Sequence, residues 1–134
     1  MAACVFADLA EKAGAAGRFV VDSAATSTEE IGNPIYPPAA RKLREKGVRV
    51  LPHTARQMTR ADYNAYDQLI GMDEANRRNM TRIAGGDGAG KIRLLLDFTD
   101  RPGEVSDPWY TRDFERAYQD IRRGCEGLLA ALTT

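Results

Sequence analysis

The sequence predicts an α/β fold, a three-layer arrangement in which a parallel sheet carries helices on both faces, in one domain of residues 1–134. Short apolar runs rich in β-branched residues alternate with longer stretches in which apolar residues recur three and four positions apart. Strands separated by helices form parallel sheets with helices on their faces. The chain has 134 residues and no internal repeat or linker, which fits a single domain.

The first half of the chain predicts two helices around one strand. Apolar residues four apart indicate a helix over residues 1–13. Phe19–Val21 is a short apolar run typical of a buried strand. Residues 24–38 are rich in Thr, Ser, Gly, Asn and Pro and predict a loop. A helix is then expected over Pro37–Lys46, because proline is tolerated in a first turn and Gly47 can end the helix.

The alternation continues through the middle of the chain. Thr59 can cap a short helical turn that reaches Tyr63. Leu69–Met72 reads as a second buried strand. Asp73 is a suitable N-cap for a helix that ends near Ile83.

A third strand and a long helix complete the predicted fold. Ile92–Leu96 is the strand, and residues 97–110 are expected to be irregular. The last helix is the clearest, because its apolar residues repeat at three and four, and Thr111 or Asp113 can cap it. These apolar residues are Phe114, Ala117, Tyr118, Ile121, Cys125, Leu128 and Leu132.

Charge and hydropathy exclude several classes of partner. Lys plus Arg total 19 and Asp plus Glu total 19, so no net charge attracts nucleic acid, and we predict none as partner. No apolar run approaches the ~20 residues that span a bilayer, so no membrane association is expected. The first residues lack a basic region and carry Asp8 and Glu11, which predicts a cytoplasmic protein.

The chain has two cysteines, Cys4 and Cys125, each among apolar residues at helical spacing. We expect buried free thiols rather than a disulfide framework, which needs more cysteines in a shorter chain.

The glycine-rich stretch Gly85–Lys91 matches the spacing of a nucleotide-binding loop. The residue that follows it is Ile92, so the hydroxyl that would bind magnesium is absent. The stretch also follows a predicted helix and precedes a strand, the reverse of what a phosphate cradle needs. We therefore expect an ordinary connecting loop.

Three stretches, taken together and in order, resemble the low molecular weight protein tyrosine phosphatase family over essentially the whole chain. They are Asp22–Thr28 followed by Gly32, then His53–Gln57 with Met72–Asn76, and finally Asp107–Tyr110 ahead of Asp113–Glu115. The resemblance implies the phosphotyrosine protein phosphatase I-like fold, and a phosphotyrosine protein or an aryl phosphate as substrate.

The defining motif of that family, a cysteine followed six positions later by arginine, is absent. Ala10 and Ala131 stand six positions after Cys4 and Cys125. In the family this motif lies in a loop after the first strand, so we expect the chain to lack that strand as well. The interpretation is an inactive relative, a pseudophosphatase with a binding or regulatory role.

The resemblance also implies roles for particular residues. Asp107 matches the general acid that protonates the leaving phenol. Trp109 and Tyr110 match the aromatic wall beside the phosphotyrosine ring. Glu29 and Glu30 match variable positions at the cleft entrance.

Two further residues match positions that support the phosphate loop through hydrogen bonds, namely Ser23 and His53. No metal and no cofactor are predicted.

Two alternatives stay open. The chain is a truncated form of an active protein tyrosine phosphatase that forms a cysteinyl-phosphate intermediate, or, more remotely, a relative of arsenate reductases, which share the fold.

Loss of the first strand would leave two unpaired sheet edges. Such edges would close up, pair with a second copy to form a homo-oligomer, or leave the chain poorly folded.

Overall fold

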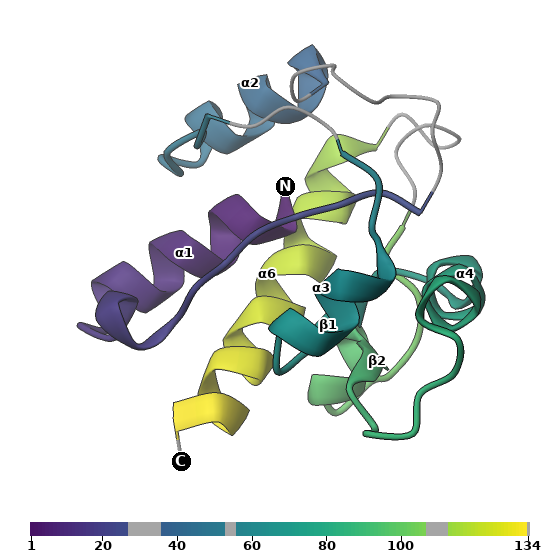
Figure 1. Ribbon diagram of the computed structural model, residues 1–134. Helices are drawn as coiled ribbons and strands as arrows, with labels where there is room; N and C mark the ends of the chain where they lie inside the picture. The colour runs from purple at the N-terminus through teal and green to yellow at the C-terminus, as the bar shows by residue number, and fades with distance from the viewer. Residues whose placement is uncertain (27–35, 53–55, 107–112, 134) are drawn as a thin grey trace.

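A computed structural model describes residues 1–26, 36–52, 56–106 and 113–133. Helical elements come first along these residues, and two short strands follow, with one helix between them and helical elements after them (Figure 1). In chain order the elements are α1 (Ala2–Lys12), η1 (Ala16–Arg18), α2 (Pro37–Glu45), α3 (Arg60–Ala65), β1 (Leu69–Gly71), α4 (Glu74–Ala84), β2 (Ile92–Leu94), η2 (Leu95–Phe98) and α6 (Phe114–Thr133).

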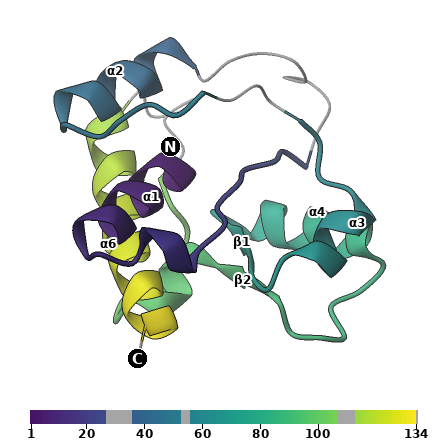
Figure 2. The same ribbon diagram turned by 60° about the vertical axis from the view of Figure 1, so that its left-hand side comes forward.

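The sheet that the structure describes is a parallel pair of strands with helices on both faces. β1 lies beside β2 with Leu69 next to Ile92 and Gly71 next to Leu94, and α4 makes the crossover between them. Figure 2 shows the two strands between α1 and α6 on one side and α3 and α4 on the other. The predicted α/β class, with its parallel sheet, is confirmed.

Two groups of buried side chains fill the spaces on either side of the sheet. The smaller group joins β1 and β2 to α4 and consists of Met58, Leu69, Met80, Ala84 and Ile92. The larger group joins α1, α2, η2 and α6, and its most deeply buried side chains are Val5, Leu43, Leu95, Tyr118 and Cys125. The long apolar face of α6 therefore supports most of the fold.

The helices begin where local capping chemistry predicts. At α3 the backbone N–H of Thr59 donates to Oδ2 of Asp62 at 2.8 Å, which forms a capping box. At α4 the carboxylate of Asp73 accepts from the N–H of Asn76 at 2.8 Å. At α6 the N–H of Arg116 donates to Asp113 at 2.9 Å, while Thr111, the other candidate cap, lies outside the described residues.

The expected strand at Phe19–Val21 is wrong for the structure described. Phe19 has extended dihedral angles, φ −128° and ψ 141°, and its ring packs edge-to-face on Phe6. Val20 and Val21 are nevertheless 84% and 38% exposed. The apolar pattern predicts an extended chain correctly, but burial needs a neighbouring strand, and the described sheet has two strands, β1 and β2.

The third predicted strand is shorter than expected. Ile92–Leu96 continues as a strand only to Leu94, because the carboxylate of Asp97 accepts from the N–H of Leu94 at 3.0 Å and starts the turn of η2. Apolar periodicity did not reveal this turn, since Leu95 and Leu96 are buried all the same.

Candidate functional site

Arg56 organises the described part of the candidate site. Its guanidinium donates to both oxygens of Asp62, at 3.0 and 3.1 Å, and to Oδ2 of Asp22 at 2.9 Å. These bonds lower the pKa of the Asp62 carboxyl, with the Arg56 hydrogen bond as the largest cause, and raise the pKa of Arg56. Arg56 and Asp62 therefore stay ionised across the neutral range.

The Arg56 cluster positions Ser23, one of the residues predicted to support a phosphate loop. The N–H of Ser23 donates to Oδ1 of Asp22 at 2.8 Å. Two residues later, Ala25 pairs in parallel with Gln57, and the carbonyl of Ala25 accepts from the N–H of Met58 at 2.7 Å. Ser23 thus lies between an ion-pair cluster and a backbone bridge, both of which fix its position.

The carboxyl end of β1 holds the chain that leads to residue 107. The carbonyl of Met72, just after β1, accepts from the N–H of Val105 at 2.9 Å. The N–H of Ser106 donates to the carboxylate of Asp120 on α6 at 3.1 Å. In parallel α/β sheets, ligands bind beyond the carboxyl ends of the strands. The described residues just before residue 107 therefore lie at the edge of the sheet where this fold class binds ligands.

Of the predicted site residues, Ser23 is described. The other six lie outside the described residues, and they are Glu29, Glu30, His53, Asp107, Trp109 and Tyr110. Their roles remain predictions.

Both cysteines are buried free thiols, as predicted. Cys4 is 8% exposed and Cys125 is 1% exposed. Burial raises the pKa of the Cys125 thiol to about 12, and this thiol donates to the carbonyl of Ala2 on α1. A nucleophilic cysteine needs a low pKa and access to substrate, and Cys125 has neither.

The glycine-rich loop uses its amides internally. It connects α4 to β2, and the N–H groups of Lys91 and Ile92 donate to the carboxylate of Asp87 at 2.8 and 3.2 Å. The hydroxyl of Tyr63 donates to the same carboxylate at 2.8 Å. Because an acidic side chain of the loop accepts these bonds, the stretch acts as the connecting loop expected from the sequence.

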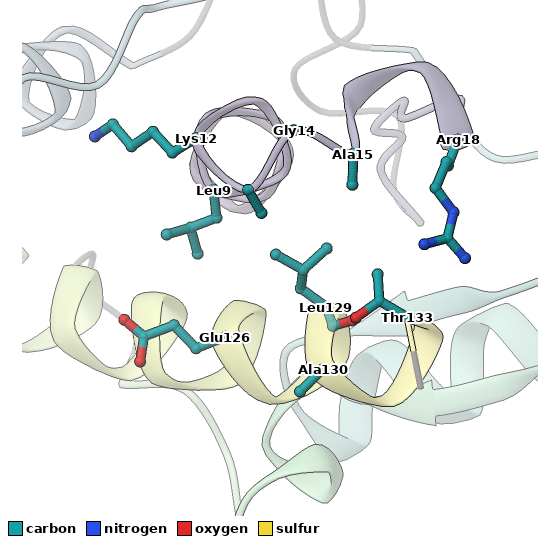
Figure 3. A pocket seen from close by; sticks show the side chains of 10 residues that line it. Leu9, Lys12, Gly14, Ala15, Arg18, Glu126, Leu129, Ala130 and Thr133 are labelled. Atoms are coloured by element: carbon teal, nitrogen blue, oxygen red, sulfur yellow. The ribbon is translucent and has the colours of Figure 1, made fainter.

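A separate hollow of about 550 Å³ lies between α1 and α6 (Figure 3). Leu9 of α1 and Leu129 of α6 face each other across it, and Lys12 and Arg18 also line it. Lys12 already pairs with Asp8 at 2.9 Å. Ser23, the predicted site residue that the structure describes, does not line this hollow.

The part of the chain that the structure describes contains neither a candidate metal site nor a candidate membrane-spanning helix. Residues 1–26, 36–52, 56–106 and 113–133 contain no group of three or more His, Cys, Asp or Glu side chains placed to hold a metal ion. Within the same residues, every helix is too short or too polar to cross a bilayer.

Sequence reasoning missed Arg56, for which it found no role. A local signal was present, because the spacing of Thr59 and Asp62 predicts a capping box and so places a carboxylate near Arg56. The second partner, Asp22, is 34 positions away and gives no local signal.

Comparison with known proteins supplies the family. A model of the family described as low molecular weight phosphotyrosine protein phosphatase matches residues 1–134. Low molecular weight protein-tyrosine-phosphatase YfkJ of Bacillus subtilis is 37% identical, over 98% of this chain and 86% of its own length. The low molecular weight phosphotyrosine protein phosphatase of Homo sapiens is 33% identical, over 96% of this chain and 84% of its own.

Solved structures agree with the sequence relatives. The crystal structure of YfkJ superposes with a TM-score of 0.93 and covers 98% of this chain, with 84% of the YfkJ chain matched. The low molecular weight protein tyrosine phosphatase from Streptococcus pyogenes, at 33% identity, gives a TM-score of 0.88, with 99% of this chain and 83% of that chain matched. The chain therefore belongs to the low molecular weight phosphotyrosine protein phosphatase family.

Proposed function

We propose that these 134 residues form a single-domain phosphatase scaffold that binds partners or regulates them and does not itself hydrolyse phosphotyrosine. One observation carries the proposal: neither cysteine is followed six positions later by arginine. The burial of Cys4 and Cys125 supports it, because a buried thiol cannot reach a bound phosphate.

The chemistry explains why the missing groups matter. The nucleophile is a thiolate, and with a pKa of about 12 only about one Cys125 side chain in 10⁵ is ionised at pH 7. Loss of a nucleophile lowers kcat on the order of 10⁶ in a measured triad enzyme. Phosphate-ester hydrolysis also starts from a very slow uncatalysed rate. Asp107, as general acid, would have no nucleophilic attack to assist.

The remaining family positions define what the scaffold would bind. In the proposal Trp109 and Tyr110 flank an aryl group, while Glu29 and Glu30 disfavour acidic peptides at the entrance. Ser23 and His53 would keep their supporting roles. The ionised Arg56 cluster supports this reading, because it holds Ser23 in place within the described residues. The proposal needs no metal, cofactor, nucleic acid or membrane, and it places the protein in the cytoplasm.

Hydrolysis of p-nitrophenyl phosphate tests the proposal. We expect no turnover above a protein-free control at pH 5 to 7. A chain extended at its N-terminus with a family-like strand and Cys-x5-Arg loop serves as the positive control. Turnover by the 134-residue chain that disappears in Asp107→Asn would show that the proposal is wrong.

A second candidate is an active protein tyrosine phosphatase in which the strand and loop precede Met1. The coverage of relatives favours it, since 14% of the length of YfkJ and 16% of that of the human relative lie outside the matched regions (100 − 86 and 100 − 84). The coding sequence immediately upstream of Met1 decides between the two candidates. An in-frame strand followed by a cysteine, five residues and an arginine would establish the second.

The arsenate reductase alternative ranks below both. That chemistry relays electrons through several cysteines, and this chain has two, both of which are buried. The relatives reported above are all described as phosphatases.

A further inference from the structure

We propose that Asp87 and Asp97 prevent the outer edge of strand β2 from pairing with a second copy of this chain. Each carboxylate binds one of the backbone N–H groups with which an added strand would pair. The outer edge of β2 is thus an interaction surface for an extended chain, and the fold itself keeps it occupied.

The outer edge is the side of β2 that faces away from β1. The N–H of Leu69 on β1 donates to the carbonyl of Lys91 at 3.0 Å, so the backbone groups of Lys91 face β1. Backbone groups of successive residues in a strand point to opposite sides, so Ile92 and Leu94 direct theirs away from β1. The sheet that the structure describes has two strands, and no described strand covers this side.

Carboxylates bind both outward N–H groups. The N–H of Ile92 donates to Oδ2 of Asp87 at 3.2 Å, and the N–H of Leu94 donates to Oδ2 of Asp97 at 3.0 Å. Asp87 precedes the strand and Asp97 follows it, so the edge is covered from both ends. Hydrogen bonds to an ionised acceptor are stronger than those to a neutral carbonyl, so an incoming strand would lose energy by displacing them.

A second partner fixes each carboxylate. Oδ1 of Asp87 accepts from the hydroxyl of Tyr63 and from the N–H of Lys91, both at 2.8 Å. Nη2 of Arg77 donates to Oδ2 of Asp97 at 3.0 Å. Because other contacts already hold these side chains in place, little further conformational entropy is lost when they bind the strand.

The sequence of β2 explains why an uncovered edge would attract another chain. Residues 92–96 are four apolar residues around one arginine, without proline, and such segments pair readily as strands. The side chains of Ile92 and Leu94 are buried, so the edge offers its backbone groups to a partner. A second copy presents the same edge, and the outward N–H and C=O groups of two Ile92 residues can pair about a two-fold axis.

Arg93 adds an obstacle of a different kind. Its side chain is exposed, with the guanidinium carbon 4.5 Å from the centroid of the Phe98 ring. In an antiparallel pair centred on Ile92, Arg93 of one copy lies opposite Lys91 of the other. Like charges directly opposite each other destabilise paired strands. A test of the two aspartates therefore starts from Arg93→Thr, which removes this repulsion and leaves both carboxylates in place.

Sedimentation velocity between about 5 and 500 µM tests the proposal. The Arg93→Thr protein is the reference and should associate no more than wild type. Adding Asp97→Ala to Arg93→Thr frees the N–H of Leu94 and should lower the dimer Kd at least tenfold. Adding Asp87→Ala instead frees the N–H of Ile92 and should act in the same direction. The two substitutions act at opposite ends of the strand, so either one tests the proposal if the other prevents folding.

The matched controls remove the second partner of each carboxylate and leave the outward N–H groups bound. They are Arg77→Met for Asp97 and Tyr63→Phe for Asp87, each added to Arg93→Thr. Both should associate like the reference. Asp97→Asn keeps an oxygen that can accept from Leu94, and it should also stay close to the reference.

Two outcomes would overturn the proposal. One is that neither Asp97→Ala nor Asp87→Ala associates more strongly than the reference. The other is that the matched controls associate as strongly as the alanine variants, because a general loss of stability would then explain the association. These measurements use no substrate, so their outcome is separate from that of the phosphatase assay.

Discussion

Arg56 illustrates which contacts of a residue can be predicted from the sequence and which cannot. Its neighbours Thr59 and Asp62 have a spacing that predicts a helix cap, and the cap is present. The cap fixes the Asp62 carboxylate, and the Arg56 guanidinium binds it in a two-bond arrangement. The link to Asp22 depends on the folded path of the chain, so no pattern of nearby residues encodes it.

Arg56→Met should loosen the segment that carries Ser23. The substitution leaves the carboxylates of Asp22 and Asp62 without their cation while keeping an apolar stem. Since Arg56 and Asp22 are both 39% exposed, water compensates in part, and we expect a loss of about 1 kcal/mol in unfolding free energy. Urea unfolding measures the loss, and hydrogen exchange should increase at Ala25 and Met58. Arg78→Met, at an exposed position on α4, is the control. Equal effects of the two substitutions would rule out a special role for Arg56.

Gly127 on α6 is a second residue whose importance depends on close packing. A Cβ atom added there would collide with the backbone carbonyl oxygen of Phe98 in η2. Alanine favours a helix over glycine by about 1 kcal/mol, but overpacking costs roughly 1–3 kcal/mol, and a backbone atom cannot rotate away. We expect Gly127→Ala to destabilise the protein by about 1–2 kcal/mol in urea unfolding.

Gly17→Ala is the matched control, because an added Cβ at Gly17 meets nothing within 4 Å. This control should be neutral or slightly stabilising. A Gly127→Ala protein as stable as wild type would show that η2 moves away from α6 at little cost.

At the scale of elements, the bounds of the helices were predicted from the sequence more accurately than those of the strands. α1, α2, α4 and α6 lie within one residue of the predicted bounds where those bounds were given, because apolar spacing and caps are local signals. Strands depend on partners far along the chain. The pattern at Phe19–Val21 could predict an extended backbone, but not whether a neighbour covers it.

Glu115 links two elements, α2 and α6, in a way that depends on pH. Its carboxylate lies 2.7 Å from Nζ of Lys46 and 3.4 Å from Nζ of Lys42. The Lys46 hydrogen bond is the largest cause of a pKa lowered from 4.5 to about 2. A lowered carboxyl pKa stabilises the fold above the unfolded value, and this stabilisation is lost as pH falls from about 4.5 towards 2.

Glu115→Gln should therefore lower the urea midpoint at pH 7 and have a much smaller effect near pH 2. Wild-type and variant midpoints measured at pH 7, 4 and 2 give the comparison. Glu126→Gln is the control, because among the described residues Glu126 pairs with Arg122, four positions earlier on α6, and such pairs contribute roughly 0.3–0.5 kcal/mol. A difference between Glu115→Gln and wild type that is the same at pH 7 and pH 2 would contradict the pKa argument.

At the scale of the whole molecule, the α/β class followed from the alternation of periodic segments, and the family from three short stretches. The contacts that assemble the candidate site could not be predicted from the sequence. Asp22 lies beside Arg56 and Ala25 beside Gln57 because the chain folds back over more than 30 residues. Sequence patterns place residues on elements, whereas packing of α1 and α6 against the sheet decides which loops meet.

The described sheet is small, so the fold depends on how its helices pack. Two strands of three residues are marginal by themselves. The larger buried group, which joins α1, α2, η2 and α6, therefore supplies the stability that the two strands cannot.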